Sequence, residues 1–405
     1  MMSIMVQKYG GSSVATPAHI KRVASHIART REEYDRVVVV VSAMGDTTDN
    51  LLELARQITG RPSPRELDML ISTGEQQSSA LLVMALQEMG CPAISLTGAQ
   101  SGISSSNVHT RAEILEIDPS RVVKELDAGK VVVVAGFQGV NGNGDITTLG
   151  RGGSDISAVA LAVALGAPVC EIYTDVEGVF TSDPRVVKGA RRLDEISYEE
   201  MLELASLGAK VLHPRAVEFA QKFNVTLHVR SSFTWTEGTL VKGVDELENK
   251  RVVSGVACDL NTAKAVIMGV PDKPGVAQQV FSALAKANIN IDMIIQSMMR
   301  DGKNDIAFTV ERSALQEAIE IMEGVAEELG AEGVAHDAGV AKVSIVGAGM
   351  VSHPGTAATM FGALGDAGIN IEMISTSEIK ISCLIQEADA QKAMQAIHER
   401  FHLDA

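Results

Sequence analysis

The sequence predicts an α/β protein in which a mostly parallel β-sheet lies between layers of helices and is followed by two small α+β modules. In the first 245 residues, continuous apolar, β-branched runs alternate with stretches whose apolar residues recur three and four positions apart. This pattern is typical of a buried parallel sheet covered by helices on both faces. Beyond that point one segment occurs twice. The length of 405 residues accommodates two or three domains of roughly 150 residues each.

The strands and helices of the first part can be placed by these patterns. The expected strands are residues 37–41, 131–135, 169–173 and 225–229, and the expected helices are residues 76–89, 154–165, 198–207 and 215–223. Ligands of such sheets bind at the carboxyl ends of the strands. The glycine-rich segments fall there: KYGGSS (8–13), SAMGDTTD (42–49), GFQGVNGNGD (136–145) and TDVEGVFTSDPR (174–185).

The second part contains an internal repeat. The segment PGVAQQVFSALAKANINIDMI (274–294) returns 80 residues later as PGTAATMFGALGDAGINIEMI (354–374). Each copy is expected to begin with a strand (265–270 and 343–346) and to continue through a Pro-Gly turn, an amphipathic helix and a second strand. A further helix is expected in each copy, over residues 313–330 and 389–400. The repeat predicts two copies of one module.

Composition and charge exclude several classes of protein. Hydrophobic residues make up 46% of the chain, which is typical of a globular protein, and 35 Lys plus Arg against 51 Asp plus Glu leave a net charge of −16. We therefore expect no nucleic-acid partner and no membrane partner. The four cysteines are scattered, and Lys8 interrupts the apolar start where a signal peptide would continue. A cytoplasmic protein is expected.

Two glycine-rich segments favour the binding of phosphate or another anion. In GRGGSD (150–155), backbone amides, a helix N-terminus and Arg151 combine into an anion site, whereas the alternative is an ordinary glycine loop capped by Ser154. In KYGGSS, Lys8 places a positive charge beside glycines that let backbone approach phosphate. The sequence contains no GxxxxGK[ST] motif, so a Walker P-loop is excluded.

The loop after the expected strand 169–173 carries Asp175, Asp183 and Arg185. An acidic residue at this position could orient lysines or hold Mg²⁺ near a nucleotide, although the same letters also fit an ordinary turn started by Asp183. Lys210 is a second lysine that phosphoryl transfer could use. His213 precedes a proline at an expected helix start and is predicted to be structural.

Taken in order, KYGGSS, SAMGDTTD, STGEQ, GFQG, TTLGRGGSD, YTDVEGVFTSDPR and KVLHPR resemble the aspartate kinases of the amino acid kinase family. The repeated modules are similar to ACT domains, which sense amino acids. The resemblance covers essentially the whole chain. It implies a kinase domain over residues 1–245, a first ACT domain over 264–337, and a second made of 246–263 together with 338–405.

The resemblance also implies the reaction and its residues. ATP, with Mg²⁺, would phosphorylate the β-carboxylate of L-aspartate to 4-phospho-L-aspartate, the first step toward lysine, threonine and methionine, and the acceptor would need no general base because it is already ionised at pH 7. The implied catalytic residues are Lys8, Asp175 and Lys210, with Asp175 orienting the lysines. The implied ATP-binding residues are Lys8, Tyr9, Gly10, Gly11, Tyr173, Thr174, Val179, Phe180, Thr181, Ser182, Asp183, Pro184, Arg185 and Lys210. The implied aspartate-binding residues are Ser42, Thr48, Glu75, Arg151, Gly152, Gly153, Ser154 and Asp155, with Glu75 on the amine and Arg151 on a carboxylate.

Feedback control by lysine, threonine or both is implied by the ACT modules. The implied effector residues are Asp272, Lys273, Pro274, Gly275, Val276, Ala277, Asn290, Ile291, Asp292 and Gln296 in the first copy, and Thr356, Ala357, Asn370, Ile371, Ser377 and Glu378 in the second. The resemblance further implies a homo-oligomer joined through the ACT domains, or an assembly with a separate C-terminal regulatory chain. The alternatives are a related kinase acting on another carboxylate, such as glutamate or acetylglutamate, and an amino-acid sensor without activity.

Overall fold

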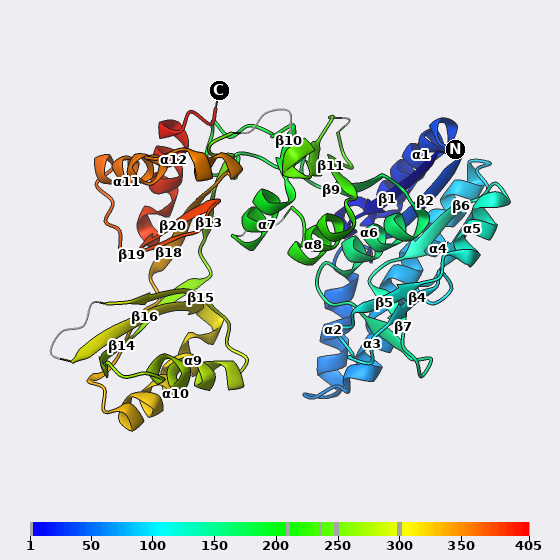
Figure 1. Ribbon diagram of the computed structural model, residues 1–405. Helices are drawn as coiled ribbons and strands as arrows, with labels where there is room; N and C mark the ends of the chain where they lie inside the picture. The colour runs from blue at the N-terminus through cyan, green and yellow to red at the C-terminus, as the bar shows by residue number, and fades with distance from the viewer. Residues whose placement is uncertain (1–2, 208–210, 235, 247–250, 298–301, 405) are drawn as a thin grey trace. The chain divides into compact units, whose positions relative to one another are not determined.

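The computed structural model describes residues 3–207, 211–234, 236–246, 251–297 and 302–404 (Figure 1). The chain divides into two compact units. The first contains Met1–Val179, Arg192–Ala205 and Lys210–Asn249, and the second contains Phe180–Arg191, Ser206–Ala209 and Lys250–Ala405. None of the helices in the described part of the chain is both long and apolar enough to cross a bilayer.

An eight-stranded sheet forms the centre of the first unit. Its strand order is β10-β12-β11-β9-β1-β2-β6-β3. All neighbours from β11 to β3 are parallel, and β12 runs antiparallel to β11, which confirms the predicted mostly parallel sheet. The strands are β1 (Ile4–Tyr9), β2 (Arg36–Val41), β3 (Ala93–Leu96), β6 (Val131–Ala135), β9 (Val169–Thr174), β10 (Glu195–Ser197), β11 (Thr226–Ser231) and β12 (Thr239–Lys242).

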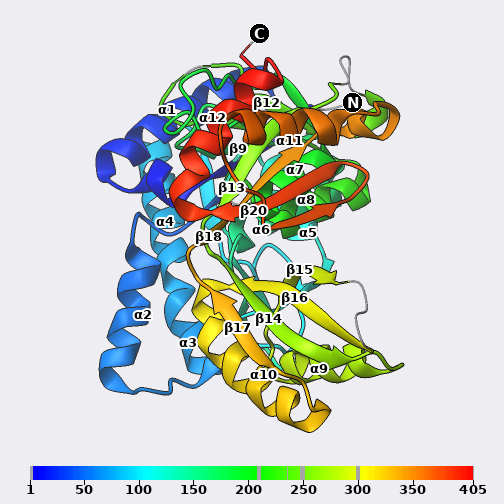
Figure 2. The same ribbon diagram turned by 90° about the vertical axis from the view of Figure 1, so that its left-hand side faces the viewer.

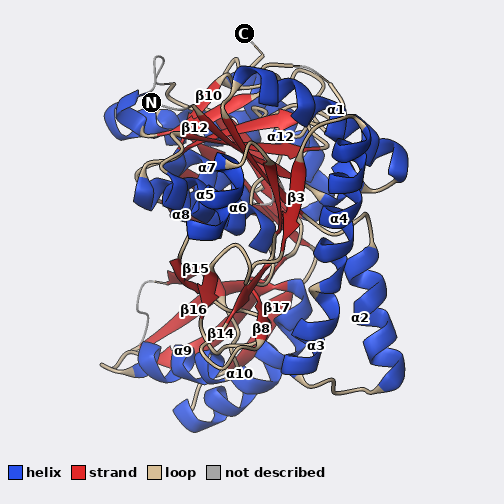
Figure 3. Cartoon of the chain, turned by 90° about the vertical axis from the view of Figure 1, so that its right-hand side faces the viewer, coloured by secondary structure: helices blue, strands red, loops and turns tan. Residues whose placement is uncertain are grey.

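Helices cover both faces of this sheet (Figure 3). Every residue from Val37 to Val41 is fully buried, because alternate side chains of a strand point to opposite faces and both faces are covered. Val37, Val39 and Val41 pack in one cluster with residues of α1 (Pro17–Glu33) and α4 (Thr73–Glu88). The other face is covered by α5 (Ser120–Asp127) and α6 (Gly153–Leu165), and α8 (Pro214–Phe223) packs on α6. With α7 (Tyr198–Ser206), the four expected helices are confirmed to within a few residues.

The first unit also contains a small sheet that the sequence did not predict. Its strands are β4 (Ile103–Ser105), β5 (Ile114–Ile117), β7 (Gln138–Val140) and β8 (Ile146–Thr148), in the order β5-β4-β7-β8. They have only three or four residues each, too few for alternation to stand out in the sequence. Two further helices of this unit are α2 (Thr47–Ile58) and α3 (Pro64–Ile71), and α3 packs against β8.

The second unit holds two modules of the same design, each a four-stranded antiparallel sheet with two helices (Figure 2). The first comprises β14 (Thr262–Pro271), α9 (Val276–Lys286), β15 (Ile291–Gln296), β16 (Lys303–Glu311), α10 (Leu315–Leu329) and β17 (Gly333–Asp337). The second comprises β13 (Gly255–Asp259), β18 (Val340–Val346), α11 (Thr356–Asp366), β19 (Met373–Thr376), β20 (Lys380–Gln386) and α12 (Ala390–Arg400). Strand β13 pairs with β18, so the chain enters the second module before it forms the first.

The two modules are joined by reciprocal ion pairs. Lys264 of the first module pairs with Glu372 of the second, and Lys342 of the second pairs with Asp292 of the first. Asp292 and Glu372 occupy equivalent positions of the repeat, 80 residues apart. Strand β14 contacts β18, and β15 contacts β19. The repeat seen in the sequence is therefore also an approximate two-fold relation in space.

Candidate active site

The glycine-rich segments of the first unit meet at the carboxyl ends of its central strands, as predicted. The Gly10 amide donates to the Tyr173 carbonyl (3.1 Å) and the Ser42 amide to the Tyr9 carbonyl (3.1 Å). The Gly136 amide donates to the Val41 carbonyl (3.1 Å). These three backbone hydrogen bonds extend the pairing of the sheet just past the ends of β1, β2, β6 and β9. Residues from four distant parts of the chain are thereby brought to one edge of the sheet.

Lys8 and Asp155 form a buried ion pair at this edge. Lys8 is the last residue but one of β1, and its Nζ lies 2.6 Å from Asp155 Oδ1, with both side chains 11% exposed. Asp155 belongs to the first turn of α6, which packs against β1. Because the side chains of a strand alternate, Lys8 faces α6 while its neighbours face α1. The site therefore holds a positive charge beside the N-terminus of a long helix.

The partner of Lys8 corrects one expectation. Asp175 was expected to orient the lysines, but the carboxylate beside Lys8 belongs to Asp155. Asp175 is exposed in the turn that follows β9, where it accepts a hydrogen bond from Thr174 Oγ1 (3.1 Å). The difference arises because Lys8 points at the helix that covers the sheet and not along it toward the next loop. Lys210 lies outside the described residues.

Glu75 offers a buried carboxylate oxygen that has no partner. The residue lies in the first turn of α4 and is 3% exposed. Its Oε1 accepts from the Ala43 amide (3.1 Å), whereas Oε2 has no hydrogen-bond partner among the described residues. Burial raises the pKa of Glu75 to about 7, although the bond from the Ala43 amide works in the opposite direction. A cationic group placed beside Oε2 would relieve the cost of burying this charge.

The GRGGSD segment forms the tight turn that starts α6. Gly150 and Gly152 have φ of 76° and 71°, in the left-handed region that favours glycine. A Cβ atom at Gly152 would lie 2.2 Å from His213 Cγ, so only glycine fits against this ring. Arg151, between the two glycines, is exposed. His213 accepts from the Arg215 amide at the start of α8 and therefore has the structural role predicted for it.

The remaining predicted aspartate-binding residues border the same loops. Gly153 and Ser154 are buried in the first turn of α6, so their amides belong to its N-terminus. Ser42 and Thr48 are half-buried, and the Ser42 carbonyl accepts from Ser78 Oγ (2.7 Å), which ties the loop after β2 to α4. The edge thus presents backbone amides, hydroxyls, the ion pair of Lys8 with Asp155 and one buried carboxylate oxygen of Glu75.

Tyr9 and Tyr173 lie on the opposite face from Lys8. Their rings stack at 4.7 Å with an interplanar angle of 8°. The Tyr9 hydroxyl is 2.6 Å from His26 Nδ1, and the Tyr173 hydroxyl donates to Glu171 Oε2 (3.0 Å). Burial raises the pKa of Tyr9 well above its ordinary value. Both tyrosine side chains are therefore turned away from the proposed nucleotide site. Only the backbone of these two residues is available at the strand ends.

The loop predicted to line the nucleotide pocket is divided between the units. Val179 belongs to the first unit, where its amide donates to Thr239 Oγ1 (2.9 Å), but Phe180–Arg191 belongs to the second. There the fully buried Thr181 places its Oγ1 2.9 Å from His398 Nε2 of α12. Val187 joins the hydrophobic core of the second module. No pattern in the sequence pointed to this anchoring.

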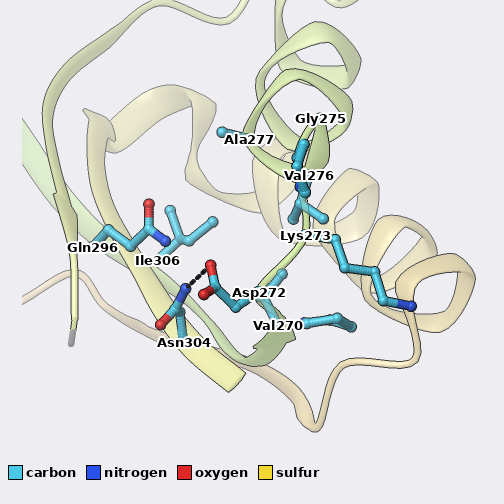
Figure 4. A pocket seen from close by; sticks show the side chains of 11 residues that line it. Val270, Asp272, Lys273, Gly275, Val276, Ala277, Gln296, Asn304 and Ile306 are labelled. Atoms are coloured by element: carbon cyan, nitrogen blue, oxygen red, sulfur yellow. Dashed lines mark hydrogen bonds between the residues drawn. The ribbon is translucent and has the colours of Figure 1, made fainter. Parts of the chain in front are cut away.

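A cavity of about 440 Å³ lies in the first module (Figure 4). Its lining includes Asp272–Ala277 and Gln296, which are among the predicted effector residues, together with Val270, Pro271, Asn304 and Ile306, which the sequence did not identify. Asn304 Nδ2 donates to Asp272 Oδ1 (3.0 Å), and Asn304 Oδ1 has no partner among the described residues. Lys273 extends away from Asp272 and Gln296. The polar groups toward the cavity are therefore acceptors and neutral amides.

The other predicted effector residues lie apart from the lining of this cavity. Asp292 forms an ion pair with Lys342, Ile291 is the first residue of β15, and Asn290 directly precedes that strand. In the second module, Thr356 Oγ1 donates to the His353 carbonyl (2.9 Å) and Ala357 and Ile371 pack against the core. Asn370 precedes β19, and Ser377 and Glu378 form the turn between β19 and β20.

Comparisons with known proteins agree with this arrangement. Residues 3–231 match the model of the amino acid kinase family, and residues 266–324 and 343–401 each match that of the ACT domain. The aspartokinase of Mycolicibacterium smegmatis is 52% identical over 407 residues, which covers 99% of this chain and 97% of that protein. E. coli aspartokinase III, solved in complex with aspartate and ADP, matches with a TM-score of 0.79 at 28% identity, over 98% of this chain and 99% of its own. Its complex with lysine and aspartate matches with a TM-score of 0.77 over the same shares, also at 28% identity.

Proposed function

Because the chain belongs to the amino acid kinase family, as an aspartokinase with two ACT domains, we propose that the strand-end residues of its first unit phosphorylate the β-carboxylate of L-aspartate with ATP. The identity of the substrate rests on Glu75, whose buried Oε2 has no hydrogen-bond partner in the described part of the chain. A free α-ammonium group supplies the missing charge. An N-acylated acceptor would instead leave this carboxylate unpaired in a buried site.

The opposite end of the substrate meets the GRGGSD turn. The Arg151 guanidinium can bind a carboxylate through two parallel hydrogen bonds, and the amides at the start of α6 favour negative charge. Ser42 and Thr48 add hydroxyl groups. A small acceptor with an ammonium group and two carboxylates thus finds one acidic and one basic partner. Both proteins compared above carry the name aspartokinase, and the E. coli structure contains aspartate.

The transfer needs positioning and charge more than acid–base chemistry. A β-carboxylate oxygen attacks the γ-phosphorus, the bond to the β,γ-bridging oxygen breaks, and ADP leaves with that electron pair. No proton moves, because the attacking carboxylate is ionised at pH 7. Lys8 offsets charge on the transferring group. Because the Gly10 amide donates to the Tyr173 carbonyl, the Gly11 amide is the one of the pair that approaches the phosphates. Asp155, 2.6 Å from Lys8, keeps the ammonium group in place.

The metal requirement is proposed as Mg²⁺ bound to ATP. Among the described residues no three Asp, Glu, His or Cys side chains gather into a metal cage. Mg²⁺ is commonly held by one or two carboxylates together with substrate phosphates, so the residues present fit an ion that enters with the nucleotide. When bound, it neutralises phosphate charge. Asp155 is the carboxylate closest to the proposed phosphate position, because it contacts Lys8.

The regulatory proposal rests on the cavity of the first module. Asp272 is an acceptor suited to an ammonium group, and Asn304 and Gln296 add side-chain amides (Figure 4). We propose that lysine, threonine or both together bind there and inhibit, as expected for end products of a pathway that starts from aspartyl phosphate. The E. coli relative has been solved with lysine.

The proposed assembly is a homo-oligomer joined through the ACT modules, with a separate regulatory chain as the alternative. The edge strands β15 and β19 support it, because Ile294 and Ile374 are 53% and 41% exposed at equivalent positions of the repeat. The proposed domain boundaries, 1–245, 264–337 and 246–263 with 338–405, are supported by the pairing of β13 with β18. Phe180–Arg191 departs from them, since it packs in the second unit.

An ADP-release assay with a panel of amino acids tests the proposal. L-Aspartate should give turnover that depends on Mg²⁺, and hydroxylamine should trap the acyl phosphate as a hydroxamate. Glutamate and N-acetylated acceptors should be poor substrates. Lysine and threonine, added singly and together, should lower the rate. Turnover with another acceptor and none with aspartate would overturn the proposal, whereas turnover that is indifferent to both amino acids would overturn only its regulatory part.

A further inference from the structure

A fully buried carboxylate links the segments that lead to the proposed substrate site. Asp68, in α3, is completely shielded from solvent and lies within hydrogen-bond distance of three residues from two other segments. Thr148 Oγ1 donates to Oδ1 (2.5 Å), and the Thr110 amide lies 3.1 Å from Oδ1 and 3.0 Å from Oδ2. His109 Nδ1 lies 2.7 Å from Oδ2. Separating these segments would leave a buried carboxylate without its hydrogen-bond partners, which carries a large cost in free energy.

These bonds join the two segments that carry the ends of the proposed aspartate clamp. Asp68 precedes Glu75 by seven residues, in a helix that continues directly into α4. Thr148 precedes Arg151 by three residues, at the end of β8. Strand β8 lies beside α3 (Figure 3). The bond between Asp68 and Thr148 therefore contributes to the separation of the acidic and basic ends.

Two further contacts support the same frame. Gln138 Nε2 donates to the Ser72 carbonyl (2.9 Å), which is a second tie between the start of α4 and the small sheet, because Gln138 pairs with Thr148 across β7 and β8. Gly150 leaves room for the Thr110 carbonyl, since a Cβ atom there would lie 3.2 Å from that oxygen. Thr110 itself has a φ of 65°, which is uncommon for a β-branched residue. The bonds to Asp68 hold this unfavourable turn against the loop that carries Arg151.

We propose that Asp68, acting through Thr148, is a positioning residue that sets the length of acceptor the kinase prefers. This inference rests on the proposed function and concerns the same site. Glutamate has the ammonium group and both carboxylates of aspartate but one more methylene, so it needs a different separation between the Glu75 and Arg151 ends. A pocket discriminates against one methylene by about 10- to 200-fold when its walls are held firmly. Loosening the frame should erode that discrimination.

The test compares Thr148→Val, which removes the hydroxyl at nearly constant shape, with Thr148→Ser, which keeps it. Steady-state kinetics with aspartate, glutamate and ATP are measured for both variants and the wild type. For Thr148→Val we expect the KM for aspartate to rise about tenfold, the KM for ATP to change less than twofold, and the ratio of kcat/KM for aspartate over glutamate to fall at least fivefold. Thr148→Ser should restore all three values.

His109→Leu provides a second variant, because the His109 side chain is 18% exposed and tolerates replacement better than the buried threonine. The substitution His109→Leu removes another bond to Asp68. The KM for aspartate should therefore rise, and the ratio of kcat/KM for aspartate over glutamate should fall. Equal increases in both KM values, or an unchanged specificity ratio in folded Thr148→Val and His109→Leu, would overturn the positioning role. A wild type that does not use aspartate would overturn the proposed function itself, which the first assay separates from this result.

Discussion

Replacing Glu75 by glutamine removes a buried charge while keeping the shape of the side chain. In the wild type, burial raises the pKa of Glu75 to about 7 from an ordinary value of 4.5, and no described residue forms a hydrogen bond with Oε2. The ionised form is the one that pairs with an ammonium group. Aspartate is therefore expected to bind the ionised form, and its affinity should fall as the pH drops through 7. Glutamine still accepts from the Ala43 amide but cannot supply the charge.

The magnitude follows from the pKa. With a value of about 7, roughly one tenth of Glu75 is ionised at pH 6 and roughly nine tenths at pH 8, so the affinity for aspartate should differ about tenfold between them. The free energy of unfolding changes with pH in the opposite direction to the affinity for aspartate. A carboxyl whose pKa is raised on folding contributes most below its unfolded value, and the contribution is lost as the pH rises from about 4.5 to about 7. The shift corresponds to about 3 kcal/mol.

Calorimetric titration with aspartate alone measures this directly, because the ionisation of ATP does not enter. In wild type at pH 6.5, binding should release about 0.8 proton, detected as a heat that varies with the ionisation enthalpy of the buffer. Glu75→Gln should bind more weakly at pH 8, lose the dependence on pH between 6 and 8, and release no proton. The same decline below pH 7 in the glutamine variant would refute the assignment of this pKa to the substrate site.

The other assignments can be tested by single substitutions. Lys8→Ala should lower kcat about 10²- to 10³-fold, because it removes the buried ammonium group beside the glycine turn, and a folded variant with near-normal turnover would exclude Lys8 from the mechanism. Arg151→Lys keeps the charge but loses the planar fork, so the KM for aspartate should rise more than the KM for ATP, and the reverse result would move Arg151 to the nucleotide. Asp272→Asn should raise the concentration of lysine or threonine that gives half-inhibition at least tenfold, and an unchanged inhibition curve would place the effector elsewhere.

Much of the fold could be predicted because its signals are local. The valine runs of β2 and β6 and the alternation in β11 identified strands, since a buried strand must be apolar along its length. The repeat identified two modules of one design, and the structure confirms strands and helices at matching positions in both. The small sheet of β4, β5, β7 and β8 was missed because strands of three or four residues leave no clear periodicity.

The candidate site was predicted in its parts but not in its pairings. Chain order and glycine spacing placed Lys8 and its neighbouring glycines at a strand end, because the connections of a parallel sheet return to the same edge. The GRGGSD turn was placed at a helix start, and Glu75 was predicted only through the resemblance to the family. No pattern in the sequence showed that Lys8 would form its ion pair with Asp155, 147 positions away, and not with Asp175. That choice depends on which face of β1 the lysine occupies and on which helix covers that face.

The sequence by itself thus determined the fold class, the two modules, the family and the types of residue at the site. Only the tertiary structure decided which residues are partners: Lys8 with Asp155, Asp68 with Thr148, Asn304 with Asp272, and Thr181 with His398. The physical reason is that periodicity reports how a segment is buried and not what buries it. Partners separated by up to 217 residues are set by the lateral order of the strands and the packing of helices upon them, which no single segment encodes.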